Sequence, residues 1–289
     1  MAGCAVSTWR ESWPAPAKLN LFLHVTGRRA DGYHSLQTAF RLIDLADTLR
    51  FTPRDDGQLG LRRPLAGVPP EQDLCMRAAA LLKRVSGHRG GVDIELDKRI
   101  PMGGGLGGGS SDAATTLIAL NHLWRLGLKR AQLQQLALEL GADVPLFVFG
   151  ENAFAEGVGE ELAPLALPQA WYLVLVPPVQ VPTAAVFAAP ELTRDAKPIK
   201  ITAFFDGLKR RALRNDLEPV VCERFPEVAR HLAWLRRHGD ARMSGSGACV
   251  YSEFSNESAA YEVHAQLPQS MRGLVARGLE RHPLQEFGK

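Results

Sequence analysis

Alternating apolar and polar residues near the start of the chain predict a β-strand over residues 14–27. The apolar positions recur at every second residue, at Leu19, Leu21, Leu23 and Val25. A period of two is typical of a strand with one buried face, so these side chains are expected to share that face. The opposite face then carries Lys18, Asn20, Phe22 and His24. The pattern predicts a half-buried strand that presents a lysine and an asparagine side by side.

Further strands and helices are predicted through the first half of the chain. Strands are expected at residues 35–42, 47–51, 92–96 and 146–149. Apolar residues at helical spacing predict helices over 73–85, 113–124 and 130–140. Ser110 or Ser111 would cap the second of these helices. Residues 53–70 contain four prolines and three glycines, which indicates a loop or a lid.

The second half begins after a proline-rich stretch at residues 162–168 that lacks periodicity, and we expect the domain joint there. Two domains follow from this interpretation, residues 1–165 and residues 166–289. The second domain is predicted to contain strands at 171–176 and 248–254 and helices at 202–209, 226–238 and 258–266. Strands and helices do not alternate as regular βαβ units, so the fold class is expected to be α+β.

Composition excludes several classes of protein. The chain has 289 residues, 46% of them hydrophobic, and a formal net charge of +3. It can therefore bury a core, but it exerts little attraction on nucleic acid or anionic lipid. The four cysteines are isolated, which argues against a disulfide framework or a zinc site. The start lacks an apolar signal core, and the longest apolar run covers only residues 170–178, so a cytoplasmic protein is expected.

Glycine is the one unusual residue type, and its excess is local. The chain has 27 glycines, against roughly 20 expected at about 7% usage. Six of them occupy the seven positions from Gly103 to Gly109. Such a loop can turn its backbone N–H groups inward to bind an anion, and a helix N-terminus directly after it adds positive charge. A flexible linker is the alternative, but linkers seldom run from a strand straight into an apolar helix.

The glycine run matches none of the common phosphate-loop motifs in its context. No GxxxxGK[ST] is present, so the loop is not a P-loop. The spacing GxGxxG occurs at residues 103–108, but residues 97–102 separate it from the preceding strand, and no acidic residue stands near Leu128. The Val-Ala-Ile-Lys, His-Arg-Asp and Asp-Phe-Gly elements of protein kinases are also absent.

Residues 101–114 resemble the central motif of the GHMP family of small-molecule kinases. They read Pro-Met-Gly-Gly-Gly-Leu-Gly-Gly-Gly-Ser-Ser-Asp-Ala-Ala. Four further segments resemble the branch of this family that phosphorylates a hydroxyl of a cytidine diphosphate-linked polyol in isoprenoid biosynthesis, and they lie at residues 16–21, 30–34, 140–145 and 244–250. The segments occur in order from about residue 14 to 280, whereas the glycine motif alone would indicate only the family.

The resemblance implies an architecture and its cofactors. The N-terminal domain would be a two-layer domain like domain 2 of ribosomal protein S5, and the C-terminal domain would be ferredoxin-like. ATP and Mg²⁺ would be the cofactors, and the metal ligands are not identified. The ATP phosphates would lie on the loop formed by Pro101, Met102, Gly103, Gly104, Gly105, Leu106, Gly107, Gly108, Gly109, Ser110 and Ser111. Asp112 stands where other members carry Asn, which favours helix capping or metal interaction over phosphate contact.

Lys18 and Asp143 are the candidate catalytic residues. Lys18 is the first of only eight lysines, beside 26 arginines, but a lone strand lysine is by itself most often a solvated residue. Asp143 lies in a predicted helix-to-strand turn, where Asp is usually a turn or cap residue. The resemblance implies an Asp–Lys pair at these positions. Asp143 would then accept the proton of the acceptor hydroxyl, while Lys18 would offset negative charge.

The resemblance also implies a substrate pocket. Asn20 would lie under the acceptor, and Tyr33 and His34 would line a cytidine pocket, with a ring stacked on the pyrimidine. Phe187 would supply the opposing ring, with Thr183 nearby. On residue type alone, Tyr33 and His34 could equally be hairpin residues, and Phe187 could pack a helix. A second glycine turn at residues 244–247 would approach the phosphate loop, unless it is a plain turn before a strand.

Two other functions fit the sequence less well. A related kinase acting on homoserine, mevalonate or a sugar would have no pyrimidine to stack, so residues 30–34 and Phe187 argue against it. A non-catalytic nucleic-acid binder is disfavoured by the net charge of +3 and by the lack of a basic patch with aromatic residues. The sequence leaves the oligomeric state and the adenine pocket open.

Overall fold

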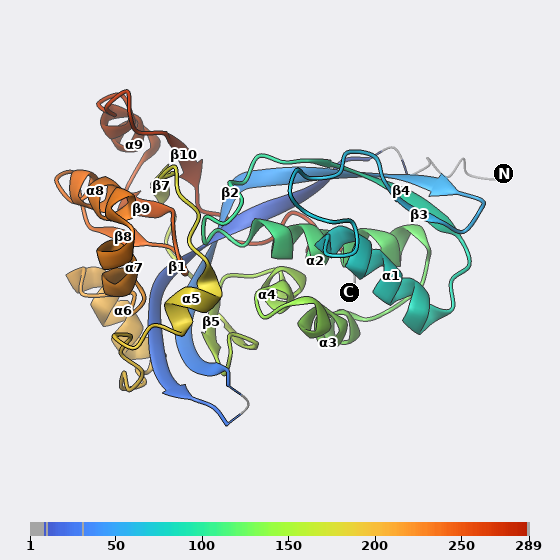
Figure 1. Ribbon diagram of the computed structural model, residues 1–289, viewed down its shortest axis with the longest axis horizontal. Helices are drawn as coiled ribbons and strands as arrows, with labels where there is room; N and C mark the ends of the chain where they lie inside the picture. Colours follow the sequence, from blue (N-terminus) through green and yellow to red (C-terminus); the bar gives the residue numbers. More distant parts are fainter. Residues whose placement is uncertain (1–8, 10, 31, 288–289) are drawn as a thin grey trace.

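The computed structural model describes residues 9, 11–30 and 32–287, which form two lobes joined by a long β-ribbon (Figure 1). The N-terminal lobe holds a six-stranded sheet in which the order β3-β4-β2-β5-β6 is completed by β1 pairing with β2. Its strands are β1 (Trp13–Arg28), β2 (His34–Arg54), β3 (Leu59–Leu61), β4 (Gly91–Asp97), β5 (Ala153–Glu156) and β6 (Glu161–Pro164). The expected strands at 35–42 and 47–51 are thus one continuous strand.

The ribbon of β1 and β2 runs between the lobes, and this position corrects the predicted burial of β1. Residues 15–25 are all buried, so the strand is covered on both faces. The register shifts between Asn20 and Phe22, which is the signature of a β-bulge. Leu23 therefore packs with the C-terminal core, whereas Leu19 and Leu21 pack in the cluster between the sheets. The expectation that all three leucines share one face is wrong.

Four helices cover one face of the larger sheet, namely α1 (Leu74–Ser86), α2 (Gly108–Leu123), α3 (Arg130–Leu140) and α4 (Val144–Phe149). Helix α2 begins five residues before the predicted start, because Gly107 at its N-cap adopts a left-handed conformation with φ 71°. Ser110 and Ser111 therefore lie inside the helix, and the predicted serine cap is wrong. The predicted strand at 146–149 is helix α4, whose uniformly apolar sequence reflects burial on all sides.

The C-terminal lobe has the expected ferredoxin-like strand order. Its four strands, β7 (Trp171–Leu175), β8 (Ala241–Met243), β9 (Val250–Phe254) and β10 (Gly273–Arg277), are antiparallel in the order β10-β7-β9-β8. Its helices are α5 (Thr183–Phe187), α6 (Ile201–Arg210), α7 (Glu218–Arg224), α8 (Pro226–Leu235) and α9 (Glu257–His264). The two-domain α+β class is confirmed, and the elements that the pattern missed are short.

The lobes are tied together by shared core and by the end of the chain. One hydrophobic cluster joins Leu19 and Phe22 of β1 to Tyr172, Phe204 and Tyr251 of the C-terminal lobe. After β10 the chain returns to the first lobe, where Gly278 bridges Ile43 and Leu284 enters the N-terminal core. The division into residues 1–165 and 166–289 stays a proposal, and the contacts of Gly278 and Leu284 place the end of the chain against the first lobe.

Part of the predicted loop at residues 53–70 forms strands. Strand β2 extends to Arg54, and β3 pairs in parallel with β4. Within the described part of the chain, no helix is long and apolar enough to cross a membrane.

Candidate active site

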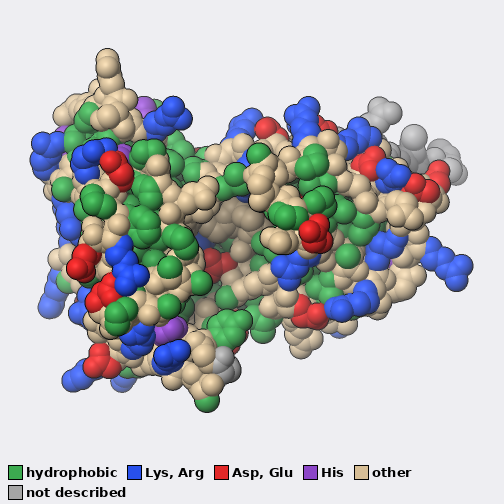
Figure 2. Space-filling view, in the orientation of Figure 1, with side chains coloured by type: hydrophobic (Ala, Val, Ile, Leu, Met, Phe, Trp, Pro, Cys, Tyr) green, Lys and Arg blue, Asp and Glu red, His purple; other side chains and the backbone are tan. Residues whose placement is uncertain are grey.

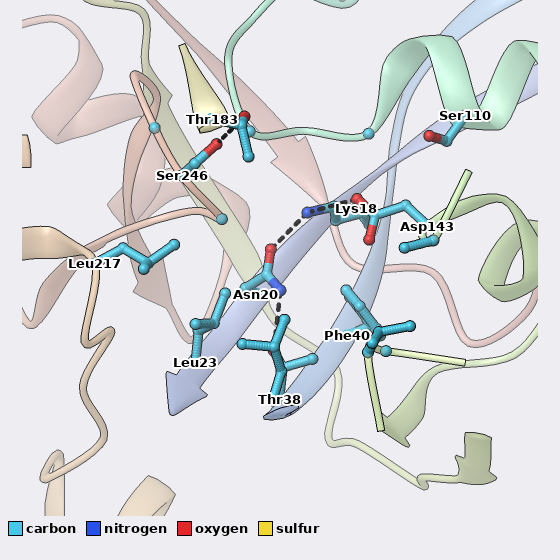
Figure 3. A pocket seen from close by; sticks show the side chains of 18 of the residues that line it. Lys18, Asn20, Leu23, Thr38, Phe40, Ser110, Asp143, Thr183, Leu217 and Ser246 are labelled. Atoms are coloured by element: carbon cyan, nitrogen blue, oxygen red, sulfur yellow. Dashed lines mark hydrogen bonds and ion pairs between the residues drawn. The ribbon is translucent and has the colours of Figure 1, made fainter. Parts of the chain in front are cut away.

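A cavity of about 350 Å³ opens between the two lobes, and it is visible as a hollow in Figure 2. Its walls come from the β1–β2 ribbon, the glycine loop before α2, the start of α4, helix α5 and the turn at 244–247. Residues far apart in the sequence therefore meet here. Figure 3 shows Lys18, Asn20 and Asp143 directed toward one another within the cavity.

Lys18 is held in a fixed position beside the partly exposed carboxylate of Asp143. Its Nζ donates a hydrogen bond to Asn20 Oδ1 at 2.6 Å and lies 3.4 Å from Asp143 Oδ2. The Lys18 side chain is 4% exposed and that of Asp143 is 36% exposed. Asn20 Nδ2 in turn donates to Thr38 Oγ1 at 2.9 Å. The chain of contacts fixes the ammonium, and the carboxylate is left open to a ligand.

The predicted phosphate loop is held in place by the second glycine turn. Ser244 Oγ donates to the carbonyl of Gly105 at 2.9 Å, and the amide of Cys249 donates to the carbonyl of Gly104 at 3.1 Å. Gly105 has φ 73°, and a Cβ there would lie 2.1 Å from the carbonyl oxygen of Ser244. Residues with a side chain rarely adopt this backbone conformation, and no side chain would fit at this position. Glycine is therefore required at residue 105. The flexible-linker interpretation is wrong, and the predicted approach of the two turns is confirmed.

The loop leads into helix α2 and forms the wall between two cavities. Gly103, Gly105, Gly107 and Ser110 line both the interlobe cavity and a second cavity of about 360 Å³ on the other side. The first amides of α2 have no intrahelical partner and carry the positive end of its dipole. Pro101, Met102, Gly104, Leu106, Gly108 and Gly109 line the second cavity only. Ser111 lines neither, because its side chain is fully buried.

The second cavity contains residues that the sequence pattern did not identify. Apolar side chains of Leu65, Val68, Leu74 and Leu96 line it together with Lys98 and Asp112. Lys98 Nζ lies 2.7 Å from Asp112 Oδ2 and also pairs with Asp47. Lys98 is one of only eight lysines, so the rarity argument that singled out Lys18 would also have found it. The predicted capping role of Asp112 is wrong, because its side chain pairs with Lys98 instead.

The two buried carboxylates around Lys98 are not equivalent. Asp47 Oδ1 accepts the backbone amides of Arg99 and Ile100 in addition to its contact with Lys98. Asp112 Oδ1 has no hydrogen-bond partner among the described residues. Burial, with Asp47 as a further negative neighbour, raises the pKa of Asp112 to about 8, although Lys98 acts in the opposite direction. The pKa of Lys98 is raised because the two carboxylates outweigh its burial.

The interlobe cavity continues into a third cavity of about 450 Å³ that is lined by aromatic residues. Tyr33, His34 and Phe187 line it, and the His34 and Phe187 rings lie 5.1 Å apart at an angle of 30°. Tyr33 is 64% exposed. Thr183 Oγ1 and Ser246 Oγ are 2.7 Å apart and link α5 to the glycine turn. All predicted substrate residues thus lie along one continuous surface, while Asp31 of the predicted turn is outside the described residues.

The fold and this site define a class of protein, the GHMP kinases. The family model for the GHMP kinases N terminal domain matches residues 73–151, and the model for the GHMP kinases C terminal matches residues 201–273. A homoserine kinase of Cytophaga hutchinsonii shares the fold with a TM-score of 0.69 over 94% of this chain and 95% of its own, at 17% identity. The models together cover more than half of the chain.

Closer relatives define the branch. The chain is 63% identical to the 4-diphosphocytidyl-2-C-methyl-D-erythritol kinase of Nitrosospira multiformis, over 96% of this chain and 94% of that protein. It is 61% identical to the enzyme of the same name from Thiobacillus denitrificans, over 96% and 98%. A crystal structure of 4-(cytidine 5'-diphospho)-2C-methyl-D-erythritol kinase matches with a TM-score of 0.81 and 38% identity, over 93% and 99%. The chain belongs to the 4-diphosphocytidyl-2-C-methyl-D-erythritol kinase family.

Proposed function

We propose that the protein transfers the γ-phosphoryl group of ATP to the 2-hydroxyl of 4-diphosphocytidyl-2-C-methyl-D-erythritol, a step of the non-mevalonate isoprenoid pathway. The observation that carries this proposal is the position of the Lys18–Asp143 pair. It lies in the cavity that is bounded by the glycine loop on one side and continues into the aromatic-lined cavity on the other. Relatives at 56–63% identity carry the name of this activity.

In the proposed reaction the acceptor oxygen attacks the γ-phosphorus while the bond to the β-phosphate oxygen breaks, and ADP leaves. The Asp143 carboxylate, which is open to the cavity, takes the hydroxyl proton. The ammonium of Lys18 faces the same space and offsets the negative charge that accumulates on the transferred group. Since phosphoryl transfer needs mainly positioning and charge stabilisation, this small set of groups suffices.

The residues around the loop fit ATP and a magnesium ion. Glycine lets the loop backbone pack closely on its neighbours, since a Cβ at Gly105 would lie 2.1 Å from the Ser244 carbonyl oxygen and one at Gly107 would lie 2.9 Å from the Phe147 ring. The apolar residues of the second cavity suit the base and sugar of the nucleotide. Mg²⁺ at phosphoryl-transfer sites is typically held by the phosphates together with one or two carboxylates or with a serine hydroxyl of the phosphate-binding loop. The Ser110 hydroxyl lines both cavities and is the protein oxygen we assign to it. The bound ion would neutralise phosphate charge during transfer.

Protein side chains contribute little to the proposed magnesium site. Among residues 9, 11–30 and 32–287, no group of three His, Cys, Asp or Glu side chains could hold a metal ion. The side chain of Ser111, the last residue of the predicted phosphate loop, is fully buried. We therefore assign the ion mainly to the phosphates of the nucleotide.

A panel of acceptor alcohols tests the proposal. The enzyme is incubated with ATP, Mg²⁺ and either the cytidyl substrate, homoserine, mevalonate or a sugar, and ADP release is measured, with Asp143→Ala as the blank. Turnover restricted to the cytidyl substrate is expected. Turnover with homoserine instead would overturn the substrate assignment, and salt-dependent RNA binding without ATP consumption would indicate a binding protein.

A further inference from the structure

A threonine on β2 contacts the side chain of Asn20 in the interlobe cavity (Figure 3). Thr38 is only 2% exposed, and its hydroxyl makes two hydrogen bonds. Oγ1 donates to the carbonyl of Phe22 and accepts from Asn20 Nδ2 at 2.9 Å. A threonine hydroxyl has a single hydrogen, and the carbonyl of Phe22 takes it. Toward Asn20 the hydroxyl therefore acts only as an acceptor.

The bulge in β1 brings these groups together. From β1 the cavity is lined by Lys18, Asn20 and Leu23, so the alternation shifts by one position after Asn20. Thr38 is the strand partner of Leu23 and not of Phe22. A regular strand would direct the Phe22 ring to the cavity face. The bulge instead keeps that ring in the core between the sheets and leaves its carbonyl to Thr38.

The two neighbours of the Asn20 amide fix its orientation. The ammonium of Lys18 has donors and no lone pair, so the amide atom 2.6 Å from Nζ must be the acceptor Oδ1. Thr38 requires a donor at the other end, which is Nδ2. A rotated amide would turn its NH₂ group toward the ammonium and would give Thr38 two acceptors for one hydrogen. The backbone is held as well, since the Asn20 amide donates to Ser244 Oγ and its carbonyl accepts from Tyr251.

The oriented amide restricts how the Lys18 ammonium can turn. Of its three N–H groups, one donates to Asn20 Oδ1, and Asp143 Oδ2 lies 3.4 Å from the same nitrogen. One N–H group is then left for a ligand. Both glycine turns enclose the side chain, because a Cβ at Gly107 would lie 3.1 Å from Lys18 Cε and one at Gly245 would lie 3.3 Å from Nζ. A fixed Asn20 therefore fixes the direction of the remaining N–H group.

We propose that Thr38 is a positioning residue for phosphoryl transfer, which holds the Asn20 amide and, through it, the ammonium of Lys18 in the orientation that serves the transferred group. This inference rests on the proposed kinase function but not on the identity of the acceptor alcohol. Thr38 takes no part in proton transfer. Valine, which suits a buried strand position equally well, has the same shape and lacks the hydroxyl, so it removes this function alone.

The test compares Thr38→Val with Thr48→Val, a matched control on the same strand. Thr48 pairs with Pro14 and Asp97 and lines none of the three cavities. Kinetics are measured with ATP and the acceptor that the panel of alcohols identifies. In Thr38→Val we expect kcat to fall about tenfold, the scale of one lost buried hydrogen bond, while KM for ATP stays within about twofold. Thr48→Val should keep the parent values, and Thr38→Ser, which retains the hydroxyl, should recover kcat to within about threefold.

A double-mutant cycle shows whether Thr38 acts through Asn20. An Asn20→Ala background has no amide to orient, so adding Thr38→Val should lower kcat by less than about twofold. A tenfold loss in that background would show that Thr38 acts independently of Asn20 and would overturn the proposal. An unchanged kcat in Thr38→Val, with a melting temperature that shows it to be folded, would overturn it as well.

A measurement without turnover separates this proposal from the proposed function. Hydrogen exchange of the Asn20 side-chain amide is followed in ¹H–¹⁵N spectra, and it should be at least about tenfold slower in the parent than in Thr38→Val. Exchange in the parent at the rate of an exposed amide would contradict the proposal, even if Thr38→Val does not fold. Turnover of a different acceptor with the same dependence on Thr38 would overturn the acceptor assignment alone. No turnover with any acceptor would overturn both.

Discussion

The cavities on the two sides of the phosphate loop are built in different ways. The second cavity, called the donor-side cavity from here on, is lined by residues 65–112 only, a single stretch of the N-terminal lobe. The interlobe cavity, called the acceptor-side cavity, is lined by residues of β1, β2, α5 and the turn at 244–247. These residues are up to 229 positions apart, from Lys18 to Gly247. Gly103, Gly105, Gly107 and Ser110 line both. Under the proposed function, nucleotide binding would therefore be a local property of the sequence, whereas acceptor recognition would depend on how the lobes pack.

The charges differ in the same way. On the donor side, Lys98 lies between two buried carboxylates and is neutralised within the protein. On the acceptor side, the carboxylate of Asp143 is partly exposed beside a buried lysine. A buried, mutually paired cluster supports a loop, while an exposed carboxylate next to a cation is available for proton transfer. The two regions thus separate structural from chemical use of similar residues.

The largest effect is expected from Asp143→Ala, which changes the lining of the acceptor-side cavity and leaves that of the donor-side cavity intact. Loss of a general base costs about 10²- to 10⁴-fold in kcat. ATP affinity should remain, because Asp143 does not line the donor-side cavity. Steady-state kinetics and ATP binding by calorimetry measure the two quantities, with Asp143→Asn as the isosteric control. Turnover near that of the parent would remove Asp143 from the base role, and loss of ATP binding would break the separation of the two sides.

Gly105→Ala should instead damage both sides, because the loop is their shared wall. The new Cβ would lie 2.1 Å from the Ser244 carbonyl oxygen at φ 73°, and overpacking of this kind costs about 1–3 kcal/mol. We expect KM to rise for ATP and for the acceptor together, and the melting temperature to fall. Gly27→Ala is the control, since a Cβ there would meet Ser35 Cβ at 3.9 Å. A KM change for ATP alone would show that the loop does not couple the cavities.

Phe187→Ala and Tyr33→Ala test the third, aromatic-lined cavity, into which the acceptor-side cavity continues. Both residues line the aromatic cavity and neither lines the donor-side cavity. Stacking on a base contributes about 1–3 kcal/mol, so each variant should raise KM for the cytidyl substrate roughly tenfold. KM for ATP should not change, and initial rates at varied concentrations of each substrate measure both. An unchanged KM for the cytidyl substrate in both variants would contradict a pyrimidine held by these rings.

The same contrast explains what the sequence could predict. The glycine loop and the helix after it follow from residues adjacent in the chain, and the structure confirms that they form one unit. The two-sided burial of β1 did not follow, because the second lobe that covers it lies more than 140 residues later. The bulge between Asn20 and Phe22 leaves no mark in an apparently regular alternation. Helix α4 was predicted as a strand, because a short apolar run has no periodicity to separate the two.

The candidate site divides in the same way. Lys18, Asn20 and Asp143 meet as predicted from the resemblance, although Asn20 and Asp143 are 123 positions apart in the sequence. The Asp47–Lys98–Asp112 cluster was missed, since Asp47 lies 51 positions before Lys98 and no local pattern links them. A contact between distant polar residues depends on strand register, which β2 and β4 fix only when they pair. Resemblance can supply such pairs, while spacing and periodicity cannot.

Asp112→Asn is expected to have the smallest effect. This residue lines the donor-side cavity, and its substitution should change how the stability of the protein depends on pH. Burial raises the pKa of Asp112 to about 8, well above the ordinary value of about 4 that applies to the unfolded chain. Between these values the folded protein binds a proton that the unfolded chain has released, so stability should fall as pH rises from about 4 to about 8. Asn removes this titration and still accepts a hydrogen bond from Lys98, which keeps Asp47 as its charged partner. We expect a higher melting temperature than the parent at pH 8, by several degrees, and near-equal values at pH 4, measured by calorimetry with the nucleotide absent. Parallel pH profiles for the two proteins would show that Asp112 is ionised in the folded state throughout, and that the donor side carries an unneutralised charge after all.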